Sequence, residues 1–276
     1  AAVAALAVDG TSATTLVTDT VGATLAPALL YNDSRARDEA GRVAALAPRE
    51  SGAHGPSASL PKALWLLARN PGAERVAHQA DWVAGRLAGR PGVSDENNAL
   101  KLGYDPLARA WPGWLAGLGL DPALLPEVVP PGTPLGPLDP AVAGVLGLAP
   151  ETRVVAGTTD SIAAFIATGA DTPGDAVTSL GSTLVLKVLS ERPVYAPDQG
   201  VYSHRLGDLW LAGGASNSGG AALLAHFTPE EMERLTPALD PDHPTGLDYY
   251  PLPAPGERFP RNDPALAPRT HPRAGD

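Results

Sequence analysis

The sequence predicts a two-domain α/β protein. Three observations carry this prediction: a length of 276 residues, an alternation of short apolar runs with segments of helical spacing, and polar turns that follow several of the apolar runs. With roughly 150 residues per domain as a prior, the length predicts two domains or one large one. Strands that alternate with helices along the chain are typical of the α/β class.

Composition excludes several classes of function. Hydrophobic residues make up 44% of the chain and charged residues 18%, which indicates a globular protein. The net charge of −10 argues against nucleic acid and an anionic membrane surface as partners, because both require a basic face. The absence of cysteine excludes disulfide scaffolds and thiol catalysis and is compatible with a reducing cytoplasm. The chain contains no apolar run of about 18 residues, so no transmembrane helix is expected.

The first thirty residues predict strands and turns. An apolar run, Val3–Val8, lacks the basic residues of a signal peptide and predicts a buried strand. The turn Asp9–Ser12 follows, then the β-branched run Thr14–Val17, and with Ala23–Leu30 these segments suggest a small meander. Since the chain has no initiator methionine and opens inside the first strand, we expect a fragment of a longer protein.

Between residues 33 and 87 the apolar residues recur at helical spacing. Residues 33–46 predict a short helix, and a second helix is expected to begin with Ser59 as N-cap and Pro61 in its first turn. A third is predicted over Ala77–Leu87. The proline- and glycine-rich segment Trp111–Leu148 favours a connector, so a domain boundary is expected near residue 152.

The second half repeats the pattern. Strands are expected at Arg153–Ala156, Ala176–Leu180, Leu184–Leu189 and Leu209–Ala212, and helices at Ser161–Thr168 and Ala221–Phe227. The two middle strands predict a hairpin around Gly181-Ser182-Thr183. The tail from Pro251 onward shows no periodicity.

Common catalytic motifs are absent from the chain. It contains no phosphate-binding Gly-x-x-x-x-Gly-Lys-Ser/Thr loop, no Gly-x-Gly-x-x-Gly, no His-Glu-x-x-His and no Gly-x-Ser-x-Gly. The six histidines are scattered, so no residue is expected to ligate a metal, and His204 and His226 are interpreted as structural or surface residues.

The strand-to-helix turn Gly157-Thr158-Thr159-Asp160 is the most informative segment. An aspartate at a helix start can take a proton from a bound alcohol, and the helix N-terminus favours a nearby phosphate. The alternative is that Asp160 only caps the helix that follows it.

Other turns carry weaker signals. The hairpin turn Thr178–Thr183 and the loop Gly213–Gly220 could each bind phosphate through backbone N–H groups, or could be ordinary packing turns. Asp9–Ser12 ends a strand, where α/β proteins place ligand groups, or is a plain turn. Asn32-Asp33-x-Arg35 could hold a polyol or cap a helix.

Taken together, these motifs resemble a known family. The string Val155–Ala164, Pro173-Gly174 and Ser179–Thr183 is similar to the C-terminal signature of the FGGY carbohydrate kinases. Four N-terminal landmarks follow the family order: Asp9–Ser12, Tyr31–Ala36, Ser94–Ala99 and Leu125–Val129. Three further segments resemble the D-ribulokinase/xylulokinase-like branch of the family: Ser57–Trp65, His78–Trp82 and Leu247–Leu252.

The resemblance implies a ribonuclease H-like fold of the actin-like ATPase type, with a sugar-binding domain over residues 1–152 and an ATP-binding domain over 153–276. It implies Mg²⁺-ATP-dependent phosphorylation of a keto-pentose, D-ribulose to D-ribulose 5-phosphate, with Asp160 as general base. The residues implied to contact the sugar are Thr11, Ser12, Ser59 and Asp160, and those implied to contact the ATP phosphates are Gly181, Ser182, Thr183, Gly219 and Gly220.

Two departures from the family pattern qualify this expectation. The family's opening strand with its Asp-x-Gly-Thr hairpin, and the Gly-Gly-Gly loop that holds adenine, have no counterpart in the sequence. The second domain is therefore expected to be incomplete and the chain inactive by itself. D-xylulose or another ketose or polyol stays open as substrate, as do a non-catalytic sugar-binding protein, a sugar-independent ATPase and a homodimer.

Overall fold

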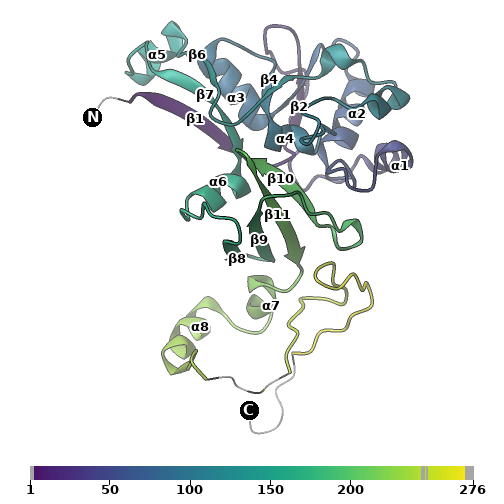
Figure 1. Cartoon of the computed structure of the whole chain (residues 1–276), viewed down its shortest axis with the longest axis vertical. Coiled ribbons are helices and arrows are strands. Elements are labelled where there is room, and N and C mark those ends of the chain that lie inside the picture. The colour runs from purple at the N-terminus through teal and green to yellow at the C-terminus, as the bar shows by residue number, and fades with distance from the viewer. Residues whose placement is uncertain (1–2, 244–245, 247, 271–276) are drawn as a thin grey trace. The chain divides into compact units, whose positions relative to one another are not determined.

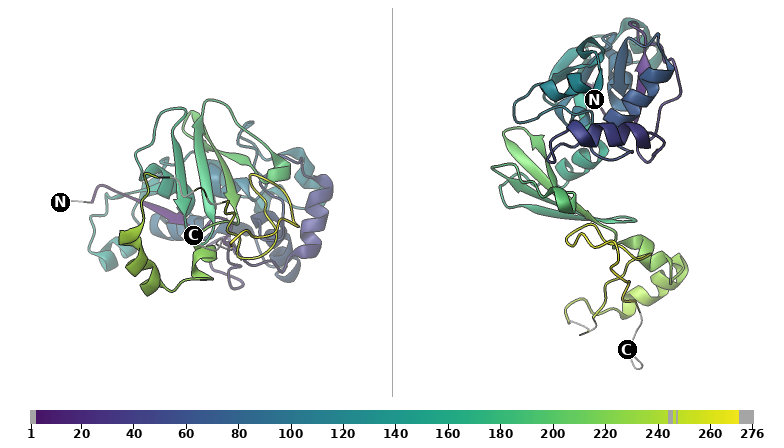
Figure 2. Two further views of the ribbon diagram at one scale, coloured as in Figure 1. Left: turned by 90° about the horizontal axis from the view of Figure 1, so that it is seen from below. Right: turned by 90° about the vertical axis from the view of Figure 1, so that its right-hand side faces the viewer.

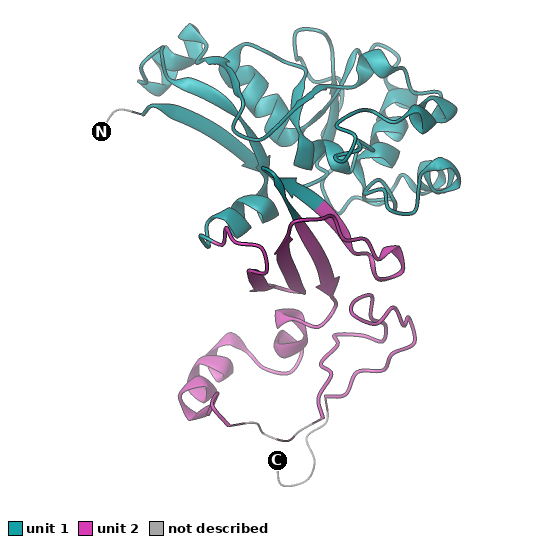
Figure 3. Cartoon of the chain, in the orientation of Figure 1, with its two compact units in different colours: residues 1–169, 204–210 teal, residues 170–203, 211–276 magenta. Residues whose placement is uncertain are grey.

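The computed structural model describes residues 3–243, 246 and 248–270, which divide into two compact units (Figure 3). Unit 1 comprises the chain through Gly169 together with His204–Trp210, and unit 2 comprises the remainder. The end of the tail and Leu247 of the last family landmark lie outside the described residues.

A three-stranded sheet organises unit 1. Strand β1 (Ala5–Gly10) pairs in parallel with β7 (Arg153–Thr159), and β6 (Pro134–Pro137) lies antiparallel on the far side of β7. Helix α3 (Gln79–Ala88) packs against β1 and β7, as Figure 1 shows. The parallel register sets Gly10 beside Thr159, so the carboxyl ends of β1 and β7 meet at one edge.

A second core lies under helix α2 (Ser59–Arg69). Leucines on this helix, such as Leu60 and Leu64, pack with Val17 of β2 and Val43 of α1. The elements around this core are α1 (Arg37–Leu46), the antiparallel pair β2 (Thr15–Thr18) and β3 (Arg75–His78), and the 3₁₀ turns η1 (Gly113–Leu118) and η2 (Pro122–Leu124).

Short elements complete unit 1. They are β4 (Val93–Asp95), which pairs in parallel with β5 (Glu127–Val129), and the helices α4 (Glu96–Leu100), α5 (Pro140–Leu146) and α6 (Asp160–Ile166). None of the helices in the described ranges is long and apolar enough to cross a membrane.

A four-stranded sheet contains the strands of unit 2, which lie side by side in Figure 2. Its residues His204–Trp210, at the end of β10 and the start of β11, are grouped with unit 1. The sheet order is β10 (Tyr202–Leu206), β11 (Leu209–Ser216), β9 (Leu184–Ser190) and β8 (Ala176–Leu180). The remaining elements are η3 (Pro197–Gln199), α7 (Gly220–Leu224), α8 (Pro229–Leu235) and η4 (Thr236–Ala238). The hairpin predicted for β8 and β9 is confirmed.

A buried carboxylate fixes the tail that showed no periodicity. Glu257 accepts hydrogen bonds from Ser216 Oγ (2.6 Å), the Asn217 N–H (2.8 Å) and Tyr250 Oη (3.0 Å). Burial alone would raise the pKa of Glu257, but these bonds and the Arg258 N–H lower it to about 2. Contacts of Glu257 with the end of β11 and with Tyr250 therefore help to order a segment that has no periodicity of its own.

Several expectations about elements are wrong. The expected meander is wrong for the first strand, because β1 pairs with β7 and not with β2. The second and third segments do meet in antiparallel fashion, through bridges from Thr15 to Leu29 and from Thr18 to Thr24. The segment Trp111–Leu148 is no mere connector, since it supplies β5, β6 and α5. Ser59 is the first residue of α2 and does not cap it; Ala58 takes the cap position.

Two turns are also shorter than expected. Strand β7 continues through Gly157, Thr158 and Thr159, where it lies along β1, and β11 runs on through the first glycines of Gly213–Gly220. The division into units differs from the expected boundary near residue 152, since β7 and α6 belong to unit 1.

Candidate functional site

The candidate catalytic residue lies where β7 ends and α6 begins. Asp160 is the first residue of α6, with Thr159 at the N-cap position, and its side chain is exposed. The Ser12 N–H, 148 positions away in the sequence, donates to Asp160 Oδ1 at 3.4 Å. The alternative in which Asp160 is merely the N-cap is wrong, because the helix does not use its carboxylate as a cap.

The loop after β1 carries two of the three other residues implied to contact a sugar. Thr11 Oγ1 lies 2.6 Å from Thr14 Oγ1, which closes a tight turn over Thr11–Thr14. Ser12 Oγ is buried and has no hydrogen-bond partner among the described residues. A buried hydroxyl without a partner costs free energy, and a ligand hydroxyl would satisfy it. The structure thus brings Ser12 and Asp160 together at one strand edge.

Two asparagines of the family landmark Ser94–Ala99, to which the sequence analysis assigned no site role, lie on α4 near the same edge. Asn97 Nδ2 donates to Thr158 Oγ1 at 3.0 Å, and both side chains are buried. Asn97 Oδ1, Asn98 Oδ1 and Thr159 Oγ1 are further buried atoms with no partner in the described chain. The signal that could have found them is the N-cap Asp95, which marks the start of α4 directly after a strand.

Ser59 lies in a different setting from the one implied for it. It is fully buried, and its Oγ lies 3.0 Å from His78 Nε2. His78 Nδ1 lies 2.9 Å from Asp81 Oδ2, so the imidazole donates from Nδ1 and leaves Nε2 to accept the Ser59 hydroxyl proton. No hydrogen bond joins this buried chain to Ser12 or Asp160 in the described residues, and the sugar contact of Ser59 stays a prediction.

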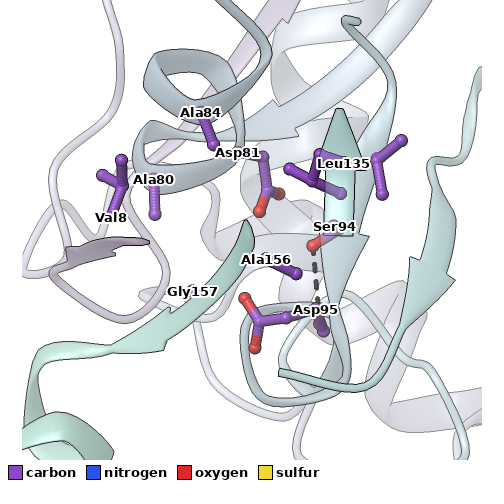
Figure 4. A pocket seen from close by; sticks show the side chains of 10 residues that line it. Val8, Ala80, Asp81, Ala84, Ser94, Asp95, Leu135, Ala156 and Gly157 are labelled. Carbon is purple, nitrogen blue, oxygen red and sulfur yellow. Dashed lines mark hydrogen bonds between the residues drawn. The ribbon is translucent and has the colours of Figure 1, made fainter. Parts of the chain in front are cut away.

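Asp95, which precedes these asparagines at the start of α4, is a buried carboxyl. Asp95 caps α4 by accepting from the Asn97 and Asn98 N–H groups at 2.8 and 3.1 Å, and its Oδ2 accepts from Asn98 Nδ2 at 2.6 Å. Asp81 and Asp95 both line a cavity of about 10 Å³ beside β7 (Figure 4), which is about the room that one water requires. Burial, and after it the Asp81 carboxylate, raises the pKa of Asp95 to about 7.

We expect Asp95→Asn to flatten the dependence of stability on pH. Because the folded-state pKa lies above the ordinary value, the folded protein holds a proton that the unfolded chain has lost, and stability falls as pH rises from about 4 to 7. The introduced asparagine cannot titrate, its oxygen can still accept from the α4 N–H groups, and its amide can donate to Asn98 Oδ1 once that side chain turns over. In urea unfolding, the free energy of unfolding of the variant should rise by about 4 kcal/mol relative to that of the native protein between pH 4 and pH 8.

Asp139→Asn is the matched control, because Asp139 caps α5 through the same two bonds but is half-exposed. Parallel stability curves for native protein and Asp95→Asn would contradict this account.

The residues implied to contact phosphate gather in unit 2. The β8–β9 turn Gly181-Ser182-Thr183 packs on the start of α7: the Gly220 N–H donates to Gly181 O at 2.7 Å and the Ala221 N–H to Ser182 O at 3.2 Å. Ser182 is exposed and Thr183 half-buried, so their hydroxyls are open to a ligand. Two separate sequence signals therefore form one cluster, a hydroxyl-bearing turn on a glycine-led helix start.

Gly219→Ala should disrupt this cluster. A methyl group on Gly219 would lie 2.7 Å from Ser182 O and from two backbone carbons of Thr183, so the turn must move. The resemblance implies a nucleotide phosphate at this turn, so in the natural gene product the affinity for ATP should fall about tenfold or more, measured by calorimetric titration. Gly213→Ala on β11 meets neighbours no nearer than 3.5 Å and is the control. Equal affinity in the two variants would argue that the turn does not bind nucleotide.

Asn32–Arg35, which could hold a polyol or cap a helix, makes local contacts in the structure. Asp33 accepts from the N–H and Nε of Arg35, so the Asn32–Arg35 segment forms an exposed turn beside α1. Hydrogen bonding to Arg35 lowers the pKa of Asp33. Across the described ranges, no group of three or more His, Cys, Asp or Glu side chains converges as a metal site.

Comparison with known proteins gives relatives over much of the chain, although no family model matches it. The chain is 32% identical over 204 residues to a xylulose kinase of Streptomyces coelicolor, and 31% identical over 202 residues to one of Streptomyces rubiginosus. Each match covers 68% of this chain and 41% of the relative, so the chain matches less than half of their length. Among solved structures, a xyloylose kinase from Brucella ovis superposes with a TM-score of 0.81 and 25% identity, over 96% of this chain and 58% of that one.

Proposed function

Because this chain belongs to the FGGY family of carbohydrate kinases, we propose that it phosphorylates a hydroxyl of a keto-pentose with ATP. The fold expected from the resemblance, the actin-like ATPase type, is confirmed. The proposal assigns the sugar and the base to unit 1 and the nucleotide phosphates to unit 2.

The observation that carries the proposal is the setting of Asp160. The carboxylate is exposed at the joined ends of β1 and β7, and the Ser12 N–H holds Oδ1. No other hydrogen bond to this carboxylate occurs among the described residues, so Oδ2 is left to accept the proton of a sugar hydroxyl. In phosphoryl transfer most of the acceleration comes from positioning and charge stabilisation, and the base orients the nucleophile.

Sugar hydroxyls also match the unsatisfied atoms around Asp160. Ser12 Oγ and Thr159 Oγ1 are buried groups that a polyol can satisfy, and both lie next to the strand ends that carry Asp160. A site built to hydrogen-bond each hydroxyl can separate epimers strongly, because the wrong epimer leaves a buried polar group without a partner.

Nucleotide binding is assigned to Gly181, Ser182, Thr183, Gly219 and Gly220 through their backbone N–H and hydroxyl groups. Mg²⁺ bound to the phosphates would neutralise the charge that develops on the transferred group. The ion commonly takes one or two carboxylates besides phosphate oxygens, and the exposed carboxylate of Asp9 at the end of β1 is a donor of that type.

Two keto-pentoses are candidate substrates. The resemblance of Ser57–Trp65 and neighbouring motifs favours D-ribulose, whereas the relatives described above carry the name xylulose kinase and favour D-xylulose. Both are keto-pentoses that differ in the configuration at one carbon, and the proposal covers the class.

The test is ADP formation by the natural gene product with D-ribulose, D-xylulose, glycerol or no sugar. Turnover that requires a keto-pentose supports the proposal and identifies the epimer. ADP release without any sugar would favour an ATPase, and sugar binding without turnover would favour a non-catalytic binding protein.

A further inference from the structure

A fully buried lysine lies beneath the loop that holds Asp160. Lys62 of α2 has no exposed surface, and its Nζ donates to Ala13 O at 2.5 Å and to Leu30 O at 2.8 Å. No carboxylate pairs with it within salt-bridge distance in the described residues. Burial lowers the pKa of Lys62 to about 8, an effect that Asp33 opposes and Lys101 reinforces.

An ammonium in this position needs an explanation, because a buried charge without a counter-charge is costly. A leucine or methionine would fill the space at lower cost, since the neighbours of Lys62 on this helix, Leu60 and Leu66, are core residues. Both acceptors of Lys62 are backbone carbonyls in loops. The lysine therefore constrains loop backbone and makes no ion pair.

The first acceptor, Ala13, adopts an unusual conformation. Its φ is +69°, a left-handed value that L-residues with a side chain rarely adopt, and the residue is buried. Its carbonyl accepts from two donors, Lys62 Nζ and Thr15 Oγ1 at 3.1 Å. Ser12, the residue before Ala13, gives its N–H to Asp160.

We propose that Lys62 is a positioning residue for Asp160: by holding the Ala13 carbonyl, it keeps the left-handed turn in place and the Ser12 N–H directed at the Asp160 carboxylate. The chemical consequence rests on the proposed function, whereas the structural consequence does not. Without the lysine, Ala13 can relax to an ordinary conformation, and the Ser12 peptide rotates away from Asp160.

The test uses Lys62→Met, with Leu66→Met as the matched control on the same buried helix. In ¹⁵N-labelled native protein, the Ser12 amide resonance should shift as Asp160 ionises, and this shift should be absent in Asp160→Asn. In Lys62→Met we expect the shift to fall by at least half, while Leu66→Met retains it. A Lys62→Met protein whose Ser12 amide titrates as in the native chain would overturn the proposal.

Kinetics of the natural gene product give the second measurement. We expect Lys62→Met to lower kcat about 10- to 100-fold with little change in the sugar KM, because displacement of a catalytic group by about 1 Å can cost about 100-fold in rate. Adding Ala13→Gly should restore part of the loss, since glycine adopts a positive φ without strain. A loss equal to that of Leu66→Met, or one confined to KM, would also overturn the proposal.

The role of Lys62 can be decided even if the protein is inactive or Lys62→Met does not fold. If no sugar is phosphorylated, the proposed function fails, but the Ser12 amide still decides the role of Lys62. If Lys62→Met does not fold, Thr15→Val removes the other donor to the Ala13 carbonyl and should weaken the same amide shift; an unchanged shift there would count against the proposal.

Discussion

Replacing Asp160 with asparagine should lower kcat for the keto-pentose by about 10²- to 10⁴-fold, the usual contribution of a general base. Asparagine keeps an oxygen that can accept the Ser12 N–H, so the loop geometry should survive. What is lost is the capacity of Oδ2 to take a proton from the attacking hydroxyl. Sugar affinity, measured by calorimetry, should therefore stay within a few-fold of the native value.

Asp208→Asn provides the control for this experiment. Asp208 is an exposed aspartate in the β10–β11 turn, and its substitution should leave kcat unchanged. If Asp160→Asn kept native turnover, the base would have to be another group and the proposed mechanism would be wrong. If the variant lost sugar binding together with turnover, Asp160 would act chiefly as a ligand of the sugar.

The second large effect is expected from Gly157→Ala. A methyl group on Gly157 would lie 1.8 Å from the carbonyl oxygen of Val8, far inside any permitted contact. This glycine lies where the β1–β7 register shifts between Ala7 and Asp9, so the two strands approach too closely for any side chain. Alanine must force the strands apart, and overpacking of this severity should cost roughly 3 kcal/mol or more of unfolding free energy.

Activity should fall together with stability, because Thr158, Thr159 and Asp160 follow Gly157 directly along the chain. The measurements are the urea midpoint and kcat/KM. Gly41→Ala is the matched control: Gly41 lies inside α1 with no atom near the added methyl, and the change should stabilise the helix by about 0.5–1 kcal/mol. A Gly157→Ala protein as stable as the native chain would show that the parallel pair can spread without loss.

Local patterns in the sequence were sufficient to predict some elements. The hairpin of Ala176–Leu180 and Leu184–Ser190 and the helix Arg37–Leu46 follow from apolar spacing and turn residues within a few positions, and the structure contains them. The family likewise followed from short ordered motifs, because a phosphate turn or a base at a strand end requires certain residue types.

Strand pairing required the tertiary structure. Nothing local shows that Ala5–Gly10 pairs with Arg153–Thr159, so the first strand was wrongly expected to join the meander that follows it. The segment Trp111–Leu148 was predicted as a connector because it is rich in proline and glycine. Its strands are short and gain their stability from partners elsewhere in the chain, which no local pattern shows.

The sequence by itself determined the chemistry available to this protein: an aspartate at a strand end, hydroxyl and glycine turns, and their order along the chain. Only the tertiary structure decided which groups act together. It joined Ser12 to Asp160, brought Asn97 to Thr158, and set Lys62 beneath Ala13. The physical reason is that propensity is set by neighbours within about four residues, whereas a buried polar group is defined by partners that the fold brings from far along the chain.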